Sequence, residues 1–315
     1  MHALMRDLTF DLDSLAGLSS TLLKSHHQNN YGGAVKRLNG IRDALAGTPA
    51  ANRPGFELNG LKREELIATN SMLLHELYFN SLGGDGHITL PPLDLALTAN
   101  FGSVARWRDE FKAMGRALGG GSGWVLLSFL PRDGTLVNQW ASDHSQALAG
   151  GVPLLALDMY EHAYHLDFGA ALGPYIDAFM ANIDWAAVYQ RYQHAVHAAS
   201  EPLAASHDDA AGAMLLDVRR AGMFEQAATM IPGAVWRDPA GVADWGARLV
   251  AELPADHPLL VYCVYGHEVG RATTLRLRAA GLNARFMQGG IDGWVAAGRP
   301  LVATPQAASS SGDTP

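Results

Sequence analysis

One feature constrains this chain more than any other: the pattern of apolar and polar residues changes near residue 200. Before that point the chain shows long helical periodicity and a few apolar runs, and after it short strands and helices alternate. Between the two lies 198–212, AASEPLAASHDDAAG, whose small and polar residues are typical of a linker. At about 150 residues per domain, 315 residues predict roughly two domains.

The first part divides again at about residue 117. Residues 1–117 show helical periodicity with almost no strand signal, including a helix expected over Lys62–Leu82 that ends at two glycines. Residues 118–197 mix the two patterns, with strands expected at 124–130 and at Val152–Asp158 and helical segments after them. This order of elements is typical of an α+β fold.

After the predicted linker, residues 213–302 alternate between strands and helices. The strands are expected at Met214–Val218, Ala234–Trp236, Leu259–Cys263 and Ala284–Phe286. The helices are expected around Gly222–Gln226, Val242–Leu253 and Gly270–Ala280. Such alternation predicts an α/β domain with a small parallel sheet covered on both faces. Residues 303–315 have low complexity and are expected to form a disordered tail.

Composition excludes several classes of function. The net charge of −8 argues against a nucleic-acid partner and against an anionic membrane surface. No apolar run reaches the ~18 residues needed to span a bilayer, and the first residues lack the pattern of a secretory signal. A single cysteine allows no intrachain disulfide. We therefore expect a soluble, cytoplasmic protein.

The segment DMYEHAY at 158–164 is the first motif that indicates chemistry. Asp158 ends a buried apolar strand, and His162 follows four residues later. A buried carboxylate is costly unless a cation compensates it. Histidine and aspartate together suit a redox-active iron or manganese ion, and a buried salt bridge is the alternative.

Five motifs extend this observation over residues 1–195. They are LLKSHHQNN around His26, HELYFNSLGG from His75, GSGW at 121–124, DMYEHAY at 158–164 and NIDW at 182–185. In this order they resemble the iron/manganese superoxide dismutase family. The resemblance implies an N-terminal α-hairpin followed by an α+β part, with the metal between them. It also implies one iron or manganese ion per subunit, superoxide as substrate, and four protein ligands: His26, His75, Asp158 and His162.

The resemblance assigns further roles around that ion. Ser71 stands where iron-type members carry a glutamine, and His144 stands near the manganese-type glutamine, where it would contact the solvent molecule on the metal; an ordinary loop histidine is the alternative. Other residues are expected to line the site or to bridge subunits. The expected lining residues are Tyr31, Trp124 and Trp185, with core packing as the alternative for the two tryptophans. Glu161 would reach His162 of a second copy in a homodimer or a larger oligomer, and a solvated helix residue is the alternative.

Two positions depart from the family pattern. An ungapped alignment after His26 puts Asn30 and Ala34 where members place a gateway histidine and tyrosine. The loss of these groups leaves a second hypothesis open: a metal-binding scaffold with weak or no dismutase activity.

The single cysteine lies in a second motif. Cys263 ends the apolar run PLLVYC, and a glycine-containing loop then enters a helix. Backbone N–H groups in such a loop stabilise a thiolate. An inert core cysteine is the alternative.

Residues 213–302 resemble a rhodanese domain. The matching segments are LLDVR at 215–219, IPGAVW at 231–236, YCVYGHEVGRA at 262–272 and GGIDGW at 289–294. The resemblance implies that Cys263 accepts a sulfur atom as a persulfide and that 264–269 cradles it. Asp217 and Arg219 are expected to stabilise the fold.

The loop of this second domain also departs from its family. Glu268 stands where active rhodaneses often carry an arginine, and Arg271 lies farther on. A carboxylate there would repel an anionic donor, so thiosulfate is not favoured and the sulfur donor and acceptor stay undefined. A partner-binding or redox-sensing module is the alternative to sulfur transfer.

Overall fold

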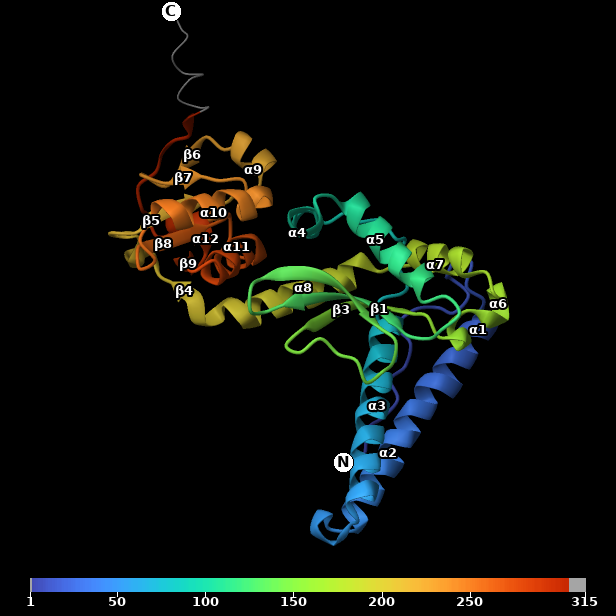
Figure 1. The fold of residues 1–315 in the computed structure, drawn as a ribbon. Coiled ribbons are helices and arrows are strands. Elements are labelled where there is room, and N and C mark those ends of the chain that lie inside the picture. Colours follow the sequence, from blue (N-terminus) through green and yellow to red (C-terminus); the bar gives the residue numbers. More distant parts are fainter. Residues whose placement is uncertain (1, 306–315) are drawn as a thin grey trace, which may run out of the picture. The chain divides into compact units, whose positions relative to one another are not determined.

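The structure is a computed structural model that describes residues 2–305. It divides into two compact units (Figure 1). Unit 1 holds the chain up to Thr89 together with Arg108–Ser128 and Asn138–Tyr189, and unit 2 holds Leu90–Trp107, Phe129–Val137 and the chain from Gln190 onward. Most of the predicted disordered tail lies outside the described residues. Within them, no helix is both long enough and apolar enough to cross a membrane.

The N-terminal part is helical, as the sequence predicts. Its elements are α1 (Ser20–Ser25), η1 (His26–Tyr31), α2 (Gly32–Gly47), η2 (Ala50–Asn52) and α3 (Gly55–Phe79). Helix α1 begins at Ser20, because the side chain of the preceding Ser19 accepts a hydrogen bond from the Leu22 N–H at 3.1 Å. Helices α2 and α3 lie side by side as the predicted α-hairpin (Figure 1).

A three-stranded sheet follows helices α4 (Pro91–Phe101) and α5 (Val104–Ala117). Its strands are β1 (Trp124–Leu130), β2 (Thr135–Ala141) and β3 (Val152–Asp158), in the order β2-β1-β3. Strand β3 ends at the buried Asp158. After it come η3 (Glu161–Ala163), α6 (His165–Phe168), α7 (Leu172–Ala181) and α8 (Trp185–Ser200).

Unit 2 contains the predicted parallel sheet. The strand order is β4-β9-β8-β5-β7, and neighbouring strands in it pair in parallel. The strands are β4 (Ala204–Ala205), β5 (Met214–Asp217), β7 (Val235–Trp236), β8 (Pro258–Tyr262) and β9 (Asn283–Met287). A separate antiparallel pair joins β6 (Thr229–Met230) to β10 (Val302–Ala303).

Helices cover both faces of this sheet. They are α9 (Ala221–Glu225), α10 (Val242–Glu252), α11 (Glu268–Ala279) and α12 (Gly290–Ala296), with the short turns η4 (Glu201–Leu203), η5 (His207–Ala210) and η6 (Pro239–Gly241). Leu216 and Val261 pack with α10 and α11 residues, whereas their neighbours Leu215 and Leu260 pack with α12. Successive residues of one strand therefore pack into the cores on opposite faces of the sheet, as the pleat of a strand requires.

Two local predictions need correction. Helix α3 begins at Gly55 and ends at Phe79, so it starts before and stops short of the predicted Lys62–Leu82. The segment 198–212, predicted as a linker, contains regular elements: α8 continues to Ser200, and Ala204–Ala205 form β4, which pairs with β9. The sequence did not predict this edge strand, because a strand of two alanines is too short to show an apolar pattern.

Candidate functional site

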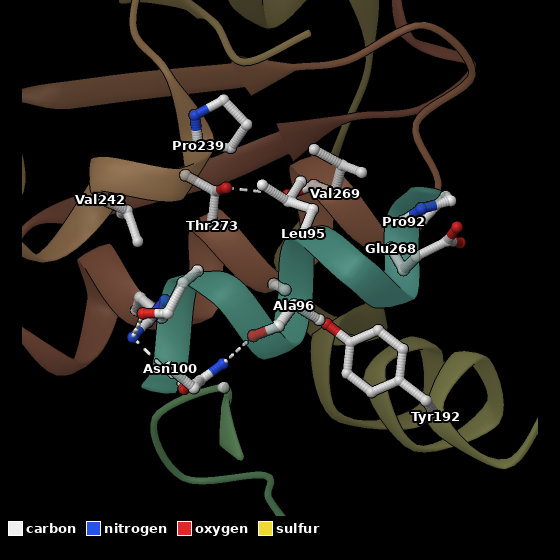
Figure 2. Close-up of a pocket in the computed structure, with 14 residues that line it drawn as sticks. Pro92, Leu95, Ala96, Asn100, Tyr192, Pro239, Val242, Glu268, Val269 and Thr273 are labelled. Atoms are coloured by element: carbon white, nitrogen blue, oxygen red, sulfur yellow. Dashed lines mark hydrogen bonds between the residues drawn. The ribbon is translucent and has the colours of Figure 1, made fainter. Parts of the chain in front are cut away.

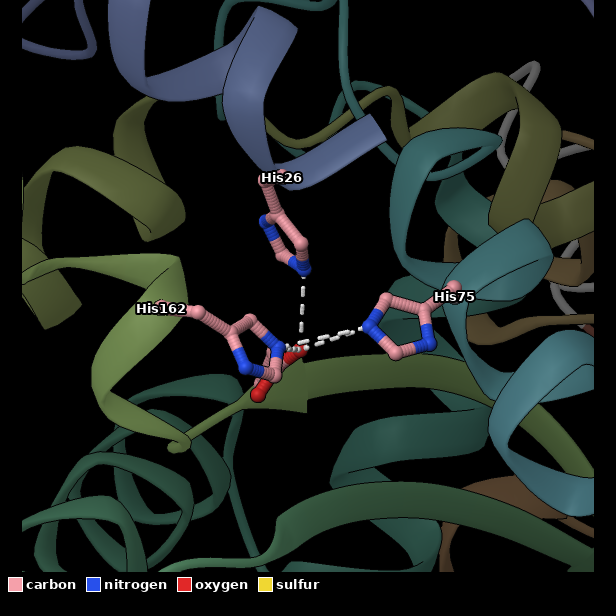
Figure 3. A group of neighbouring side chains, drawn as sticks. His26, His75 and His162 are labelled. Atoms are coloured by element: carbon pink, nitrogen blue, oxygen red, sulfur yellow. Dashed lines mark hydrogen bonds and ion pairs between the residues drawn. The ribbon is translucent and has the colours of Figure 1, made fainter. Parts of the chain in front are cut away.

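Four residues from separate elements converge in unit 1. His26 opens η1, His75 lies in α3, Asp158 ends β3 and His162 lies in η3. One nitrogen or oxygen atom from each lies within 4.8 Å of all the others. Figure 3 shows the three imidazoles directed toward a common point. The α-hairpin and the α+β part each contribute to this point.

The Asp158 carboxylate lies at the centre of the cluster. Its Oδ2 lies 3.1 Å from His26 Nε2, 3.2 Å from His162 Nε2 and 3.5 Å from His75 Nε2. Burial alone would raise the pKa of Asp158, but the facing imidazoles of His162 and His26 hold it well below its usual range. Burial lowers the pKa of His75 to about 3 and also lowers that of His26. The cluster therefore contains a buried anion among neutral rings.

Hydrogen bonding shows that this donor set fits a metal ion. The Nδ1–H of His75 donates to the Ser71 carbonyl at 2.6 Å, so the Nε2 atom of the neutral ring carries a lone pair. That lone pair faces His162 Nε2 at 3.3 Å and the carboxylate of Asp158. Acceptors that face one another in a buried site need a cation between them. Three imidazoles and one carboxylate suit iron or manganese.

A cavity of about 420 Å³ leads to the cluster in unit 1. His75 and His162 line it, and Asn30 and Ala34 form part of its wall. The resemblance predicts that these two positions would hold the gateway groups of the family. Among the described lining residues, Arg37 carries the permanent positive charge and none is a carboxylate. The charge of the lining is therefore compatible with a small anion.

His144 also lines this cavity, and its tautomer is fixed by a neighbour. The Trp124 Nε1–H donates to His144 Nδ1 at 2.9 Å, and an indole is only a donor. Burial lowers the pKa of His144, so the ring is neutral and carries its proton on Nε2. The ring stacks on Tyr160 with centroids 4.7 Å apart. His144 thus offers the same kind of N–H donor as a glutamine amide.

The other predicted site residues of unit 1 take different places. The Tyr31 ring lies 6.4 Å from the ring of His75, but its hydroxyl donates to Glu76 and accepts from the Arg6 N–H, each near 2.9 Å. Trp185 is buried and its indole donates to the Gly86 carbonyl at 3.1 Å. Glu161 is exposed on η3, next to His162.

Cys263 follows β8 directly and is buried in unit 2. The backbone N–H groups of Tyr265, Gly266, His267 and Gly270 are directed at its thiol. Burial raises the pKa of that thiol, and these N–H groups act in the opposite direction. A Cβ at Gly270 would lie 3.3 Å from the sulfur, so glycine leaves room beside it.

Glu268 is the first residue of α11, and its side chain is buried. Gln193 Nε2 donates to its carboxylate at 3.3 Å. Glu268 also lines a small cavity of about 30 Å³ in unit 2, with Tyr192 and Thr273 among the other lining residues (Figure 2). The carboxylate therefore contacts α8.

Asp217 and Arg219 form a buried ion pair in unit 2. Arg219 Nη2 lies 2.6 Å from Asp217 Oδ2, and the Tyr262 hydroxyl donates to the same oxygen at 3.0 Å. Their contacts join β5 and β8, in accord with the structural role expected for them.

Two family models match this chain, one before and one after the change of sequence pattern near residue 200. Residues 90–191 match the family model of iron/manganese superoxide dismutases, C-terminal domain. Residues 200–297 match the model of the rhodanese-like domain, which begins inside the segment predicted as a linker.

Similarity to known proteins shows which family the chain belongs to. The chain is 60% identical over 192 residues to an iron superoxide dismutase of Cupriavidus metallidurans, covering 97% of that protein and 61% of this chain. The chain belongs to the iron/manganese superoxide dismutase family. It is also 34% identical to an iron superoxide dismutase of Aquifex pyrophilus, covering 89% of that protein and 59% of this chain. It is 33% identical to a manganese superoxide dismutase of Haloferax volcanii, covering 94% of that protein and 60% of this chain.

The sequence did not predict the roles of three residues at these sites. Arg37 lines the cavity, but a lone arginine on a helix gives no signal of its own. Gly270 lies beside the thiol because α11 begins two residues before it, and the predicted start at Gly270 hid that contact. Arg271 was noticed only as displaced from the usual loop position. Its contacts depend on the tertiary structure.

Proposed function

We propose that this protein converts superoxide to dioxygen and hydrogen peroxide at one iron or manganese ion held by His26, His75, Asp158 and His162. The observation that carries the proposal is the convergence of three imidazoles and one carboxylate at the inner end of an anion-compatible cavity. When bound, the ion would alternate between its +3 and +2 states, oxidising one superoxide and reducing the next.

The protein residues hold and shield this centre. The Ser71 carbonyl orients His75, and the buried Asp158 carboxylate supplies the negative charge that a cation requires. Trp124 keeps the proton of His144 on Nε2, which gives the cavity a fixed donor. Asn30 and Ala34 leave the approach wider than a histidine and a tyrosine would.

The test is superoxide disproportionation by the full-length protein, reconstituted separately with iron and with manganese and normalised to bound metal. The account predicts turnover with at least one metal. His162→Gln should lose both metal and turnover, whereas His165→Gln changes an exposed histidine nearby and should keep both. Stoichiometric metal without turnover would support the metal-binding scaffold instead.

A second activity is supported by the Cys263 loop. The thiolate would attack the outer sulfur of a donor, the bond from that sulfur to the donor would break, and the donor would leave with the electron pair. Cys263 would then carry a persulfide, cradled by the four backbone N–H groups directed at its sulfur. Cyanide would remove the outer sulfur as thiocyanate and regenerate the thiolate.

Thiocyanate formation measures this activity. We expect turnover by the full-length protein with an organic persulfide donor and none by Cys263→Ser. If the native protein forms no thiocyanate with thiosulfate or with the persulfide, the rhodanese-like domain is a binding or sensing module.

Assembly and location complete the proposal. The protein would form a homodimer in which Glu161 hydrogen-bonds His162 of the second copy. Glu161→Gln should weaken the dimer in light scattering, because a charge-assisted hydrogen bond becomes a neutral one. A cytoplasmic location would keep the single cysteine reduced.

A further inference from the structure

The Arg271 side chain contacts the loop that follows Cys263, the end of α8 and a strand of the sheet. Its Nε–H donates to the Gly266 carbonyl at 2.9 Å. Its Nη1 donates to Ser200 Oγ at 3.2 Å and to the Glu201 carboxylate at 3.0 Å. The guanidinium also lies over the ring of Phe286, 4.1 Å from the centroid. With 12% of the side chain exposed, Arg271 is held in one place.

The carbonyl that Arg271 holds belongs to the peptide unit between Gly266 and His267. The N–H of that same unit is one of the four directed at Cys263. A trans peptide is planar, with its C=O and N–H pointing in opposite directions. Fixing the carbonyl therefore fixes the direction of the N–H. A cationic donor on the carbonyl also polarises the unit and strengthens that N–H as a donor.

Gly266 allows the loop backbone to adopt the conformation in which the Arg271 side chain reaches this carbonyl. Gly266 has φ +70°, where side chains are disfavoured, and a Cβ there would lie 2.7 Å from the Met287 carbonyl. The loop has no side-chain bulk at the point where the peptide unit turns. The side-chain contact on that carbonyl comes from Arg271.

We propose that Arg271 is a positioning residue for Cys263: it clamps the Gly266–His267 peptide so that its N–H points at the sulfur. The positive charge of Arg271 acts on the thiolate through this peptide unit. Active rhodaneses often carry an arginine at a different loop position, which Glu268 occupies in this chain. The proposal rests on the proposed role of Cys263 as a sulfur acceptor, and it concerns the anionic sulfur rather than the identity of the donor.

The surroundings of the loop contain other titratable groups. On the loop and α11 they are Tyr265, His267 and Glu268, and on the elements packed against them they are His197 of α8 and Glu201 of η4. All of these residues are retained in the Arg271 and Arg278 variants.

The experiment is the pH dependence of Cys263 alkylation by iodoacetamide in the full-length protein. The chain has one cysteine, so the modified mass reports this thiol alone. Arg271→Gln should raise the midpoint of the profile by about one pH unit, because the His267 N–H that faces the thiolate loses the cation that fixes and polarises its peptide unit. Arg278→Gln, which changes an exposed arginine on the same helix, should leave the midpoint unchanged.

Arg271→Lys separates the clamp from simple charge. Lysine keeps the positive charge but places a methylene where arginine has Nε–H, so the account predicts that most of the upward shift remains. A wild-type midpoint in Arg271→Lys, or in a folded Arg271→Gln, would overturn the proposal. Circular dichroism of each variant checks the fold.

The pH profile of Cys263 alkylation can be measured whether or not the protein transfers sulfur. If the native protein forms no thiocyanate while Arg271→Gln still shifts the alkylation midpoint, the proposed sulfur transfer fails and the clamp stands. If thiocyanate forms and the midpoint does not move, the clamp fails and sulfur transfer stands.

Discussion

Trp124 donates its indole N–H to His144 Nδ1 at 2.9 Å, and this single contact decides which nitrogen of His144 carries the proton. The consequence is a donor at Nε2 in the cavity that leads to the metal ligands.

Removing that indole donor should lower the dismutase rate. Trp124→Phe keeps an aromatic ring but removes the indole N–H, so Nδ1 of His144 is free to take the proton and Nε2 is no longer fixed as a donor. We expect the superoxide turnover per bound metal to fall about 10-fold or more, as for other residues that orient a metal's surroundings. His144→Gln, which keeps an N–H donor, should retain more activity than His144→Leu. Equal losses in these two variants would contradict the assigned donor role.

Metal removal should destabilise unit 1. Without the ion, the Asp158 carboxylate faces neutral imidazoles inside the fold, and the free energy of metal binding is lost from the native state. Thermal unfolding should show a transition about 10 °C lower after chelation, with recovery when iron or manganese returns. Asp158→Asn should no longer respond to the chelator. A transition that stays at the same temperature in the native protein would argue against a structural metal.

Charge near the cavity should control how fast an anion arrives. Arg37 lines the cavity and pairs with Glu64, which also lies 3.9 Å from Arg63. Arg37→Gln should lower kcat/KM about threefold at low salt and flatten its dependence on ionic strength. Glu64→Gln leaves both arginines unpaired and should raise kcat/KM under the same conditions. Changes in the same direction for both variants would exclude this electrostatic explanation.

The space beside Cys263 should matter for sulfur transfer and little for stability. Gly270→Ala places a methyl group 3.3 Å from the sulfur, where the outer sulfur of a persulfide needs room. Alanine favours a helix by about 1 kcal/mol over glycine, so the variant should fold while thiocyanate formation falls at least 10-fold. Gly222→Ala, in α9 with open space around it, is the matched control. Undiminished turnover in Gly270→Ala would show that sulfur binds elsewhere.

Local sequence patterns were sufficient for most elements. Strands β1, β3 and β8 are apolar runs, and such runs indicate buried strands whatever their neighbours are. The motif around Asp158 and His162 identified a candidate metal site because both residues lie on one short segment. His26 and His75 were added through resemblance, since helical spacing alone does not distinguish a ligand from a packed histidine.

The features that were missed depend on contacts between distant segments. Strand β4 exists because Ala204–Ala205 pair with β9, which no local pattern reveals. The π-helix at His26–Tyr31 was also not predicted, although such turns are frequent at functional sites. Glu268 was expected to repel anionic donors from within the loop, but its carboxylate contacts Gln193 of α8.

Dismutation at the four-residue centre is tested by superoxide turnover per bound metal, measured for the native protein and for Asp158→Asn after reconstitution with iron or manganese. We expect rapid turnover by the native protein with at least one of the two metals and a loss of metal and activity together in the variant. A native protein that holds one metal ion per chain and yet shows no turnover with either metal would contradict it.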